Sequence, residues 1–445
     1  MLPFKTDHSE GRLFSPRISK FINLKHELIL LSKSIDWKGM DREFSKLFSD
    51  SSGHPPKPVR LIVGLLLLQY MHKLSDEAVV QRWIENPYWQ HFCGYDYLEW
   101  EAPIHPSSLT RWRKRLGKDS LEKILSYTVR LAVATKTVKK KSLEKVIADT
   151  TVSPKNISYP TDSKLYFRAL HRLVHFAKKE GIVLRQSYTQ LAKKSYFKVN
   201  CYAKAKQMKR MKREQKKLKI FLGRVYRDIV RKAPKQSDFI KFLSLVKRLL
   251  EQKKTDKNKL YSLHEPKVQC IAKGKAHKRY EFGCKASFVS THKEGLLLDA
   301  QACLDNPYDG HTLKKALKRA ESFSAVQVKE AFVDKGYRGH KIDEKKIYLS
   351  GQKRGVNRRI RKNLKRRSSI EPMIGHLKND GKLDKNFLKG SSGDQNHVLL
   401  CGIAHNLKMI LRKLKTFFLY LRYFRQNNLI KILTRNLYDK DMAKV

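Results

Sequence analysis

The sequence predicts a mixed α/β fold in which helices flank a sheet, and two observations support this prediction. In the second half of the chain, short runs rich in β-branched and aromatic residues alternate with segments of helical periodicity. The predicted order of core elements is a strand, a long helical insertion, a hairpin, a helix, two further strands and a final helix. This order suits a mixed sheet in a layered α/β architecture.

Length and charge limit the classes of protein that fit this sequence. The chain has 445 residues, enough for two or three domains, and its 41% hydrophobic content excludes wholesale disorder. The formal net charge of +55 opposes compaction through self-repulsion, so we expect a polyanionic partner. Phosphate neutralisation with counterion release favours nucleic acid as that partner, and an anionic membrane surface is the alternative.

Membrane insertion and secretion have little support in the sequence. The longest apolar run, residues 59–71, is too short to span a bilayer and contains Arg60. The N-terminus lacks the apolar centre of a signal peptide. The six cysteines are scattered without a CxxC pair, which indicates reduced thiols. We therefore expect a cytoplasmic, nucleoid-associated protein that has no membrane contact.

Three helices are predicted after the Pro-rich break at residues 51–58. Apolar residues recur at helical spacing in LIVGLLLLQYMHKL, which predicts a buried helix. Ser75 precedes DEAVVQRWIE as an N-cap, with acidic residues in the first turn. A third helix, in SSLTRWRKRLG, begins after Pro106. Together they predict a compact helical domain.

Residues 163–262 form a distinct basic block. The block has 30 Lys or Arg against 6 Asp or Glu and almost no Gly or Pro. Residues 203–232 within it predict one long basic helix with an intermittent apolar stripe. As a helical arm, the block could track a DNA backbone or pair with a second subunit. A solvated helical face is the alternative for any single lysine.

The strands and helices of the sheet domain surround this insertion in the sequence. Before it, KVIAD ends a strand on Asp149. After it, strands are predicted at residues 280–290, 295–304, 328–334 and 345–351, and helices at residues 311–323 and 367–380. The predicted divisions are an N-terminal segment (1–53), a helical DNA-binding domain (54–135), the first part of the sheet domain (136–162), the basic helical insertion (163–262), the rest of the sheet domain (263–395) and basic C-terminal helices (396–445).

Three acidic residues are candidates for one catalytic site. Two predicted strands end on Asp149 and Asp334, and ligands gather at the carboxyl ends of strands in such sheets. Glu371, at the start of the last core helix, could face both strand ends. Three converging carboxylates repel one another unless a cation lies among them. Hard oxygen ligands favour Mg²⁺ or Mn²⁺, and two such ions can promote an in-line displacement at phosphorus.

Each acidic residue also has a structural interpretation. An Asp at the end of a strand is usually a turn or capping residue. The residues Ser368 to Glu371 fit a capping box, which would make Glu371 a helix cap. Pro372 disfavours helical geometry at Glu371, so the helix could instead begin after the carboxylate. The joint placement of the three acids, rather than any one of them, favours the catalytic interpretation.

Several sequence motifs occur, some in the sheet domain and some in the helical block. The sheet domain contains DTTV and YPTDS, then NPYDGHTL, VDKGYRGH and RRSSIEPMIGHLKNDGKLDKNFLKG. The helical block contains VGLLLLQYMHKLSDEAVVQRWIENPYWQHFCG and PSSLTRWRKRLG. These motifs resemble those of the bacterial insertion-sequence transposases of the IS-five family. The resemblance covers most of the chain, and the motifs together are specific where DKGY alone is weak. It implies a DDE-type enzyme with an RNase H-like core.

The resemblance also assigns roles to individual residues. It places the Asp–Asp–Glu triad on Asp149, Asp334 and Glu371, as ligands of two Mg²⁺ ions, with Mn²⁺ as an alternative. Related enzymes carry a Tyr, Arg, Glu and Lys series around the last acid. Here Arg367 and Lys378 match this series, whereas Leu364 occupies the Tyr position.

The same comparison of motifs indicates supporting residues and DNA contacts. Asp162 and Asp309 match family motifs and are expected to hold the geometry of the site. Arg367 and Lys378 are expected to contact DNA, Lys378 with a solvated surface lysine as its alternative. In the helix after Pro106, the predicted DNA contacts are Arg111, Arg113, Lys114 and Arg115.

The sequence therefore predicts a metal-dependent transposase. We expect it to bind terminal inverted repeats, to cleave DNA and to transfer strands to target DNA, as a homodimer in the synaptic complex. One alternative is an RNase H-like nuclease that cuts without joining. Another is a catalytically inactive, basic DNA-binding protein, which would explain the charge but not the strand-terminal acids.

Overall fold

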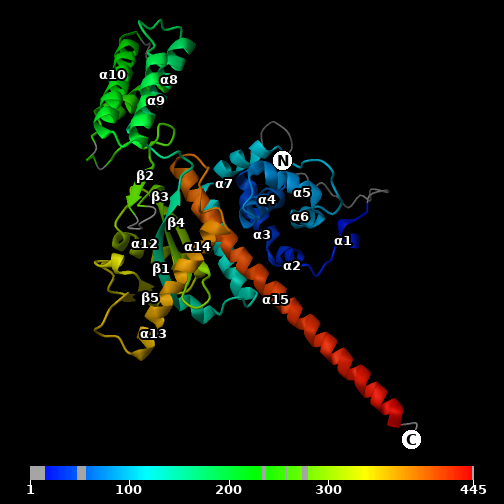
Figure 1. Ribbon diagram of the computed structural model, residues 1–445. Helices are drawn as coiled ribbons and strands as arrows, with labels where there is room; N and C mark the ends of the chain where they lie inside the picture. Colours follow the sequence, from blue (N-terminus) through cyan, green and yellow to red (C-terminus); the bar gives the residue numbers. More distant parts are fainter. Residues whose placement is uncertain are drawn as a thin grey trace.

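The computed structural model describes residues 16–47, 57–232, 237–253, 255–256, 258–272 and 279–442, and for residues 417–442 it gives the helical backbone alone. Most of the Pro-rich break and residues 1–15 of the predicted N-terminal segment lie outside the described residues. The predicted mixed α/β fold is confirmed: Figure 1 shows a sheet beside an N-terminal helical region, a separate helical bundle and one long C-terminal helix. No helix among the described residues is long and apolar enough to cross a membrane.

The N-terminal region consists of helices, of which the sequence predicted those at Val59–Met71 and Asp76–Glu85. They are α1 (Ile18–Phe21), α2 (Glu27–Ser34), α3 (Trp37–Phe44), α4 (Val59–Met71), α5 (Asp76–Glu85) and α6 (Pro87–Phe92). Helix α4 is apolar all round and buried on nearly every side, so it forms the centre of this region. Ser75 caps α5, because its hydroxyl accepts a hydrogen bond from the Ala78 backbone N–H at 3.0 Å.

Helix α7 (Pro106–Ala134) connects the helical region to the sheet domain and bends at Gly117. Gly117 has φ 60° and ψ −169°, outside helical geometry. A left-handed φ of this kind favours glycine, since a Cβ atom would be strained there. The bend separates an N-terminal part that packs on the helical region from a C-terminal part that lies under the sheet.

The sheet contains β1 (Lys145–Pro154), β2 (Gln269–Ala272), β3 (Tyr280–Thr291), β4 (Leu297–Cys303), β5 (Glu330–Val333) and β6 (Lys346–Leu349). The strand order is β2-β3-β1-β5-β6. Strand β4 lies outside this order and pairs directly with β3, along a different part of β3 from the part that pairs with β2. Strand β3 is antiparallel to both β1 and β4, whereas β5 is parallel to β1 and to β6. The five predicted strands are present, and the short strand β2 is an addition to the prediction.

Strand β1 is longer than predicted. It does not end at Asp149 but continues to Pro154, because its antiparallel pairing with β3 continues from Val146↔Thr291 to Pro154↔Gly283. Its parallel pairing with β5 ends earlier, at Ile147↔Phe332. At Gly283 an added Cβ would lie 2.1 Å from the Ser153 carbonyl oxygen, so only glycine allows this close approach of the two strands.

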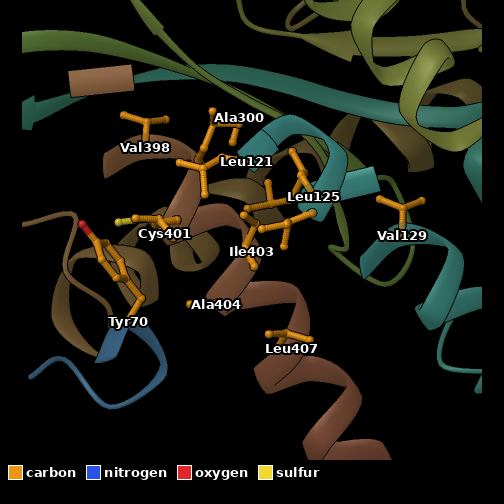
Figure 2. Close-up of a cluster of buried hydrophobic side chains, with 14 of the residues drawn as sticks. Tyr70, Leu121, Leu125, Val129, Ala300, Val398, Cys401, Ile403, Ala404 and Leu407 are labelled. Atoms are coloured by element: carbon orange, nitrogen blue, oxygen red, sulfur yellow. The ribbon is translucent and has the colours of Figure 1, made fainter. Parts of the chain in front are cut away.

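Two helices cover opposite faces of the sheet. Helix α15 (Gly390–Met442) lies on one face, where a Cβ at Gly402 would come within 2.8 Å of the Ala300 side chain. Figure 2 shows this core, in which Ile403 and Leu407 of α15 lie near Leu121 and Leu125 of α7. On the other face, Asp299 of β4 accepts a hydrogen bond from Arg319 of α12 (Asp309–Ser324).

The basic insertion is a bundle of four helices rather than a single arm. Its helices are α8 (Asp162–Lys179), α9 (Thr189–Lys204), α10 (Met208–Lys232) and α11 (Ser237–Glu251). They enclose a hydrophobic core of their own, separate from that of the sheet. The predicted single helix over residues 203–232 is wrong at its start, since Lys206 adopts a left-handed φ of 56° between α9 and α10.

The C-terminal region is one helix. Where the sequence predicted several helices from residue 396 onward, α15 runs for 53 residues without interruption. Its first half is buried against α7 and β4, and Figure 1 shows its second half extending away from the rest of the protein.

Candidate active site

Asp149 and Asp334 both follow the last pair of the β1–β5 ladder. The register of the parallel pair runs from Lys145↔Glu330 to Ile147↔Phe332, and continuing it by two residues would set Asp149 opposite Asp334, which follows the end of β5. Neighbouring residues of paired strands project from the same face of a sheet. Asp149 therefore lies in the middle of β1, at the point where β5 ends and Asp334 leaves the sheet.

Arg367 connects the third acid to this pair. Its guanidinium lies between two carboxylates, with Nη1 3.8 Å from Asp149 Oδ2 and Nη2 3.0 Å from Glu371 Oε1. Arg367 forms the short helical turn that precedes α14 (Ile370–Asn379), so the triad acid and its bridging arginine belong to one continuous segment. The side chain of Glu371 is 64% exposed and that of Asp149 is 21% exposed, so solvent reaches the site from the Glu371 side.

The capping role considered for Glu371 does not occur. Ser368 donates its hydroxyl hydrogen bond to the Lys365 carbonyl, and the N-cap residue Ser369 makes no side-chain capping bond. Glu371 lies within α14 although Pro372 follows it, since Pro is tolerated in the first turn of a helix. The carboxylate of Glu371 is thus available for the site.

Across the described ranges, no three His, Cys, Asp or Glu side chains are grouped closely enough to hold a metal ion. The Arg367 guanidinium instead provides the positive charge between Asp149 and Glu371. A cation is therefore already favoured at this position, and the surrounding oxygen donors are those that Mg²⁺ and Mn²⁺ prefer. The carboxylates of Asp149, Asp334 and Glu371 are of the chemical type that binds a divalent ion, but with Arg367 between two of them they are not grouped closely enough to hold one.

Tyr337 is buried close to several acidic residues at this edge of the sheet. Its side chain is 1% exposed, and its hydroxyl has no hydrogen-bond partner within the part of the chain that the structure describes. Burial raises the pKa of Tyr337 well above its ordinary value, and the nearby charges of Asp149, Asp309 and Asp334 raise it further. Four acidic groups, including Glu371, thus lie around one end of the sheet.

Asp309 contacts the residue of β1 that follows Asp149. Its Oδ1 accepts hydrogen bonds from the Thr150 hydroxyl at 3.0 Å and from Lys285 Nζ at 2.9 Å. Thr150 follows Asp149 directly, so these bonds fix the backbone that carries the candidate ligand. Lys285, which the sequence prediction missed, also donates to the Pro307 carbonyl at 2.7 Å.

Asp162 lies elsewhere. It begins α8, at the base of the insertion, where its carboxylate pairs with Lys259 Nζ at 2.8 Å. This ion pair connects the start of the bundle to the segment that returns from it, since Lys259 follows α11 in the sequence. The structure therefore gives Asp162 a role in the bundle and no contact with the triad.

Lys378 and Leu364 flank the acid-bearing helix. Lys378 Nζ lies 3.7 Å from Glu281 Oε2 of β3, and its ammonium is on the same helix as Glu371. Leu364, at the position where related enzymes have Tyr, packs partly buried against the hydrophobic core. The structure thus pairs Lys378 with an acid of β3 and places an apolar residue where a phenol would be expected.

Arg113 is not placed to contact DNA, contrary to the sequence prediction. It is 5% exposed, and its guanidinium forms a bidentate ion pair with Asp76 at the start of α5. It also donates to Gln69 Oε1 at 3.2 Å and to the Thr110 hydroxyl at 3.1 Å. Because every one of these partners belongs to the helical region, Arg113 joins α4, α5 and α7.

The other predicted contacts on this helix are exposed. Arg111, Lys114 and Arg115 all reach solvent, and the Arg115 guanidinium lies 5.2 Å from the Trp112 ring centroid. Trp112 itself packs against the core, as predicted. Three of the four cations proposed for this helix are thus free to meet a polyanion.

The N-terminal helical region matches a known protein family. Residues 16–115 match the family described as Transposase domain (DUF772). The chain is also 46% identical over 207 residues to an uncharacterized protein, ORF8 in the nfe locus, from Rhizobium meliloti. That alignment covers 46% of this chain and 100% of the rhizobial protein.

The chain belongs to the same family as that protein. No solved structure matches the chain. The matched transposase domain spans α1 to the first part of α7, including the exposed cations of the SSLTRWRKRLG segment. It supports a role for the chain in transposition, in general terms, and so indicates an enzyme that cuts DNA.

Proposed function

We propose that this protein is a DDE-type transposase of an insertion sequence, similar to the IS-five family, that cleaves element ends and joins them to target DNA. The observation that supports the proposal most strongly is that Asp149 and Asp334 both follow the last pair of the β1–β5 ladder, while Arg367 bridges Asp149 to Glu371. These acids come from distant parts of the sequence. A structural role for each acid alone would not require them to meet.

The topology supports an RNase H-like core in the proposal. Three antiparallel strands are followed by a helix, by two strands parallel to the first and by an acid-bearing helix. This is the order of elements that the sequence predicted for the sheet domain. The long insertion leaves the sheet after β1 and returns before β2, so it does not interrupt the strands that hold the acids.

In the proposed reaction, the chain's residues hold and orient DNA. Asp149, Asp334 and Glu371 provide the carboxylate oxygens for divalent ions, which when bound activate the nucleophile and stabilise the leaving oxygen. Arg367, released from its carboxylate partners, and Lys378 are positioned to neutralise the phosphodiester. Asp309 and Lys285 keep the β1 backbone in place through Thr150.

Joining requires no external energy source. The first step breaks a phosphodiester at the element end by hydrolysis and frees a 3′-OH. In the second step that 3′-OH attacks a target phosphodiester, so one P–O bond forms as another breaks. The exposed cations of α7 are proposed to bind the terminal inverted repeats, and the concerted treatment of two ends implies a homodimer.

The experiment that tests this function uses duplexes that already carry a free 3′-OH at the element end. Purified protein with Mg²⁺ and a target plasmid is expected to give covalently joined products, detected by gel electrophoresis of labelled ends. A nuclease would cut the uncleaved substrate but leave the pre-cleaved ends unjoined. Absence of both cutting and joining, with DNA still bound, would indicate an inactive DNA-binding protein and contradict the proposal.

A further inference from the structure

Helix α10 presents a row of cations on one face. Its members lie three, four or eight residues apart, which keeps them on one side of the helix, and the exposed Ile220 interrupts the row between Lys216 and Arg224. All six members are exposed: Lys209, Arg213, Lys216, Arg224, Arg227 and Arg231. We name this row the α10 cationic stripe. At 1.5 Å per residue it extends for about 33 Å, close to one helical turn of duplex DNA.

The acidic residues of α10 do not neutralise the stripe. Glu214 and Asp228 are buried, 8% and 6% exposed, and face the interior of the bundle. Glu214 pairs with Lys217, and Asp228 accepts a hydrogen bond from the Arg185 backbone N–H at 2.9 Å. Because both acids of α10 are buried, its exposed face carries cations and the apolar Ile220 but no acidic side chain.

Four cations of the stripe have no ion pair among the described residues: Lys209, Arg213, Lys216 and Arg227. Arg224 donates a hydrogen bond to the Tyr188 hydroxyl, and Arg231 lies 3.7 Å from Asp228 at the edge of the stripe. Like charges one turn apart on a helix repel one another. A solvated face of mixed charge would avoid this cost, so the row favours a partner of high negative charge density.

The bundle folds around its own apolar core, so the stripe is not needed for packing. Leu218, Leu222 and Ile229 are buried on the opposite side of α10, toward α8 and α9. Figure 1 shows the bundle standing clear of the helical region and joined to the sheet near β2. The stripe is therefore a surface feature on a rigid support.

We infer that the α10 cationic stripe binds the phosphate backbone of duplex DNA, without reading its sequence. This inference rests on the proposed function, which supplies DNA as the polyanion. Strand β1, which carries Asp149, leads through residues 155–161 into α8, so the bundle lies beyond the carboxyl end of this strand. The stripe would thus hold a length of duplex beside the candidate active site, as a second DNA contact separate from α7.

The test compares two variants that lose the same charge. Arg213→Gln with Lys216→Gln removes two stripe cations, and Lys178→Gln with Lys179→Gln removes two exposed cations of α8 as the matched control. Glutamine has nearly the helix propensity of lysine and arginine, so both variants should keep the wild-type melting temperature. Binding of the full chain to a random duplex is measured by fluorescence anisotropy over a range of NaCl concentrations.

The stripe variant is expected to lose roughly tenfold in affinity, and its plot of log K against log salt should become shallower by about two. The control should change much less. A swap that preserves charge, Arg213→Lys with Lys216→Arg, should bind as the wild type does, because phosphates require charge and not a particular side chain. Equal losses in the stripe variant and the control would overturn the inference while leaving the proposed function intact. Failure of the wild-type protein to bind any duplex would overturn both.

Discussion

Asp149→Asn is expected to abolish DNA cleavage and strand transfer while leaving DNA binding and folding unchanged. The substitution keeps the shape of the side chain but removes the negative charge that lies 3.8 Å from Arg367. Loss of one charged ligand of a metal-dependent phosphoryl transfer should cost on the order of a thousandfold or more in rate. The measurement is the rate of end cleavage and joining in Mg²⁺, with DNA affinity and melting temperature recorded in parallel.

A matched control is available on the same domain. Asp343→Asn makes the same chemical change at an exposed residue beyond the β5 strand, away from the three acids. It should cleave and join at the wild-type rate. Cleavage by the Asp149 variant within a few-fold of the control would contradict the assignment of the catalytic acids.

Arg113→Met is expected to destabilise the protein rather than to remove a DNA contact. The change leaves the Asp76 carboxylate partly buried without its bidentate partner, and Gln69 loses a hydrogen bond. Breaking a buried ion pair in this way costs several kcal/mol, and the partial exposure of Asp76 brings our expectation to about 2–4 kcal/mol. This loss is measured as the difference between the wild type and the variant in the free energy of unfolding by urea.

The same ion pair predicts a pH dependence. Burial alone would raise the pKa of Asp76, but the hydrogen bond and charge of Arg113, together with Gln69, lower it below its ordinary value. A carboxyl whose folded pKa is lowered stabilises the protein above its unfolded pKa, near pH 4, and loses this contribution as the pH falls through the folded pKa. The difference in stability between wild type and Arg113→Met should therefore shrink in acid.

Arg111→Met provides the comparison for Arg113. Arg111 is exposed on the same helix, so its loss should leave the stability within about 0.5 kcal/mol of the wild type and should weaken DNA binding. If Arg113→Met kept full stability but bound DNA less tightly, the structural role given to Arg113 would be wrong.

Arg113 was wrongly predicted to contact DNA, although its position in the helical periodicity indicates the packed face of α7. Leu109, Arg113 and Leu116 share one stripe of α7, so the spacing alone placed Arg113 on the packed side. Charge favoured the surface, and the partner that permits burial, Asp76, lies far away in the sequence. Asp76 itself resembled an ordinary acid of a first helical turn. Long-range pairing of this kind has no local signal.

The sheet was predictable to the extent that local patterns determine it. The positions of the strands, and the end of β5 just before Asp334, followed from alternation and turn residues. The length of β1 did not, because its last residues are held by pairing with β3 alone. The start of α10 was also missed, since Lys206 takes a left-handed conformation with no Gly or Pro nearby to indicate it.

The part of the candidate site that the sequence could not supply is the position of Arg367. The resemblance assigned Arg367 as a DNA contact, but it did not indicate that the guanidinium would lie between Glu371 and Asp149. Lys285 and Tyr337 were missed for the same reason, because each acts through contacts across the sheet.

The central claim is that Asp149, Asp334 and Glu371 bind divalent cations at the place where Arg367 now supplies the positive charge. The most direct measurement is anomalous diffraction at the manganese edge from crystals of the protein with Mn²⁺ and element-end DNA. We expect manganese in contact with Asp149 and Asp334, and the Arg367 guanidinium displaced toward the phosphodiester. Crystals in which manganese is absent from these carboxylates, and Arg367 still joins Asp149 to Glu371 beside bound DNA, would contradict the account.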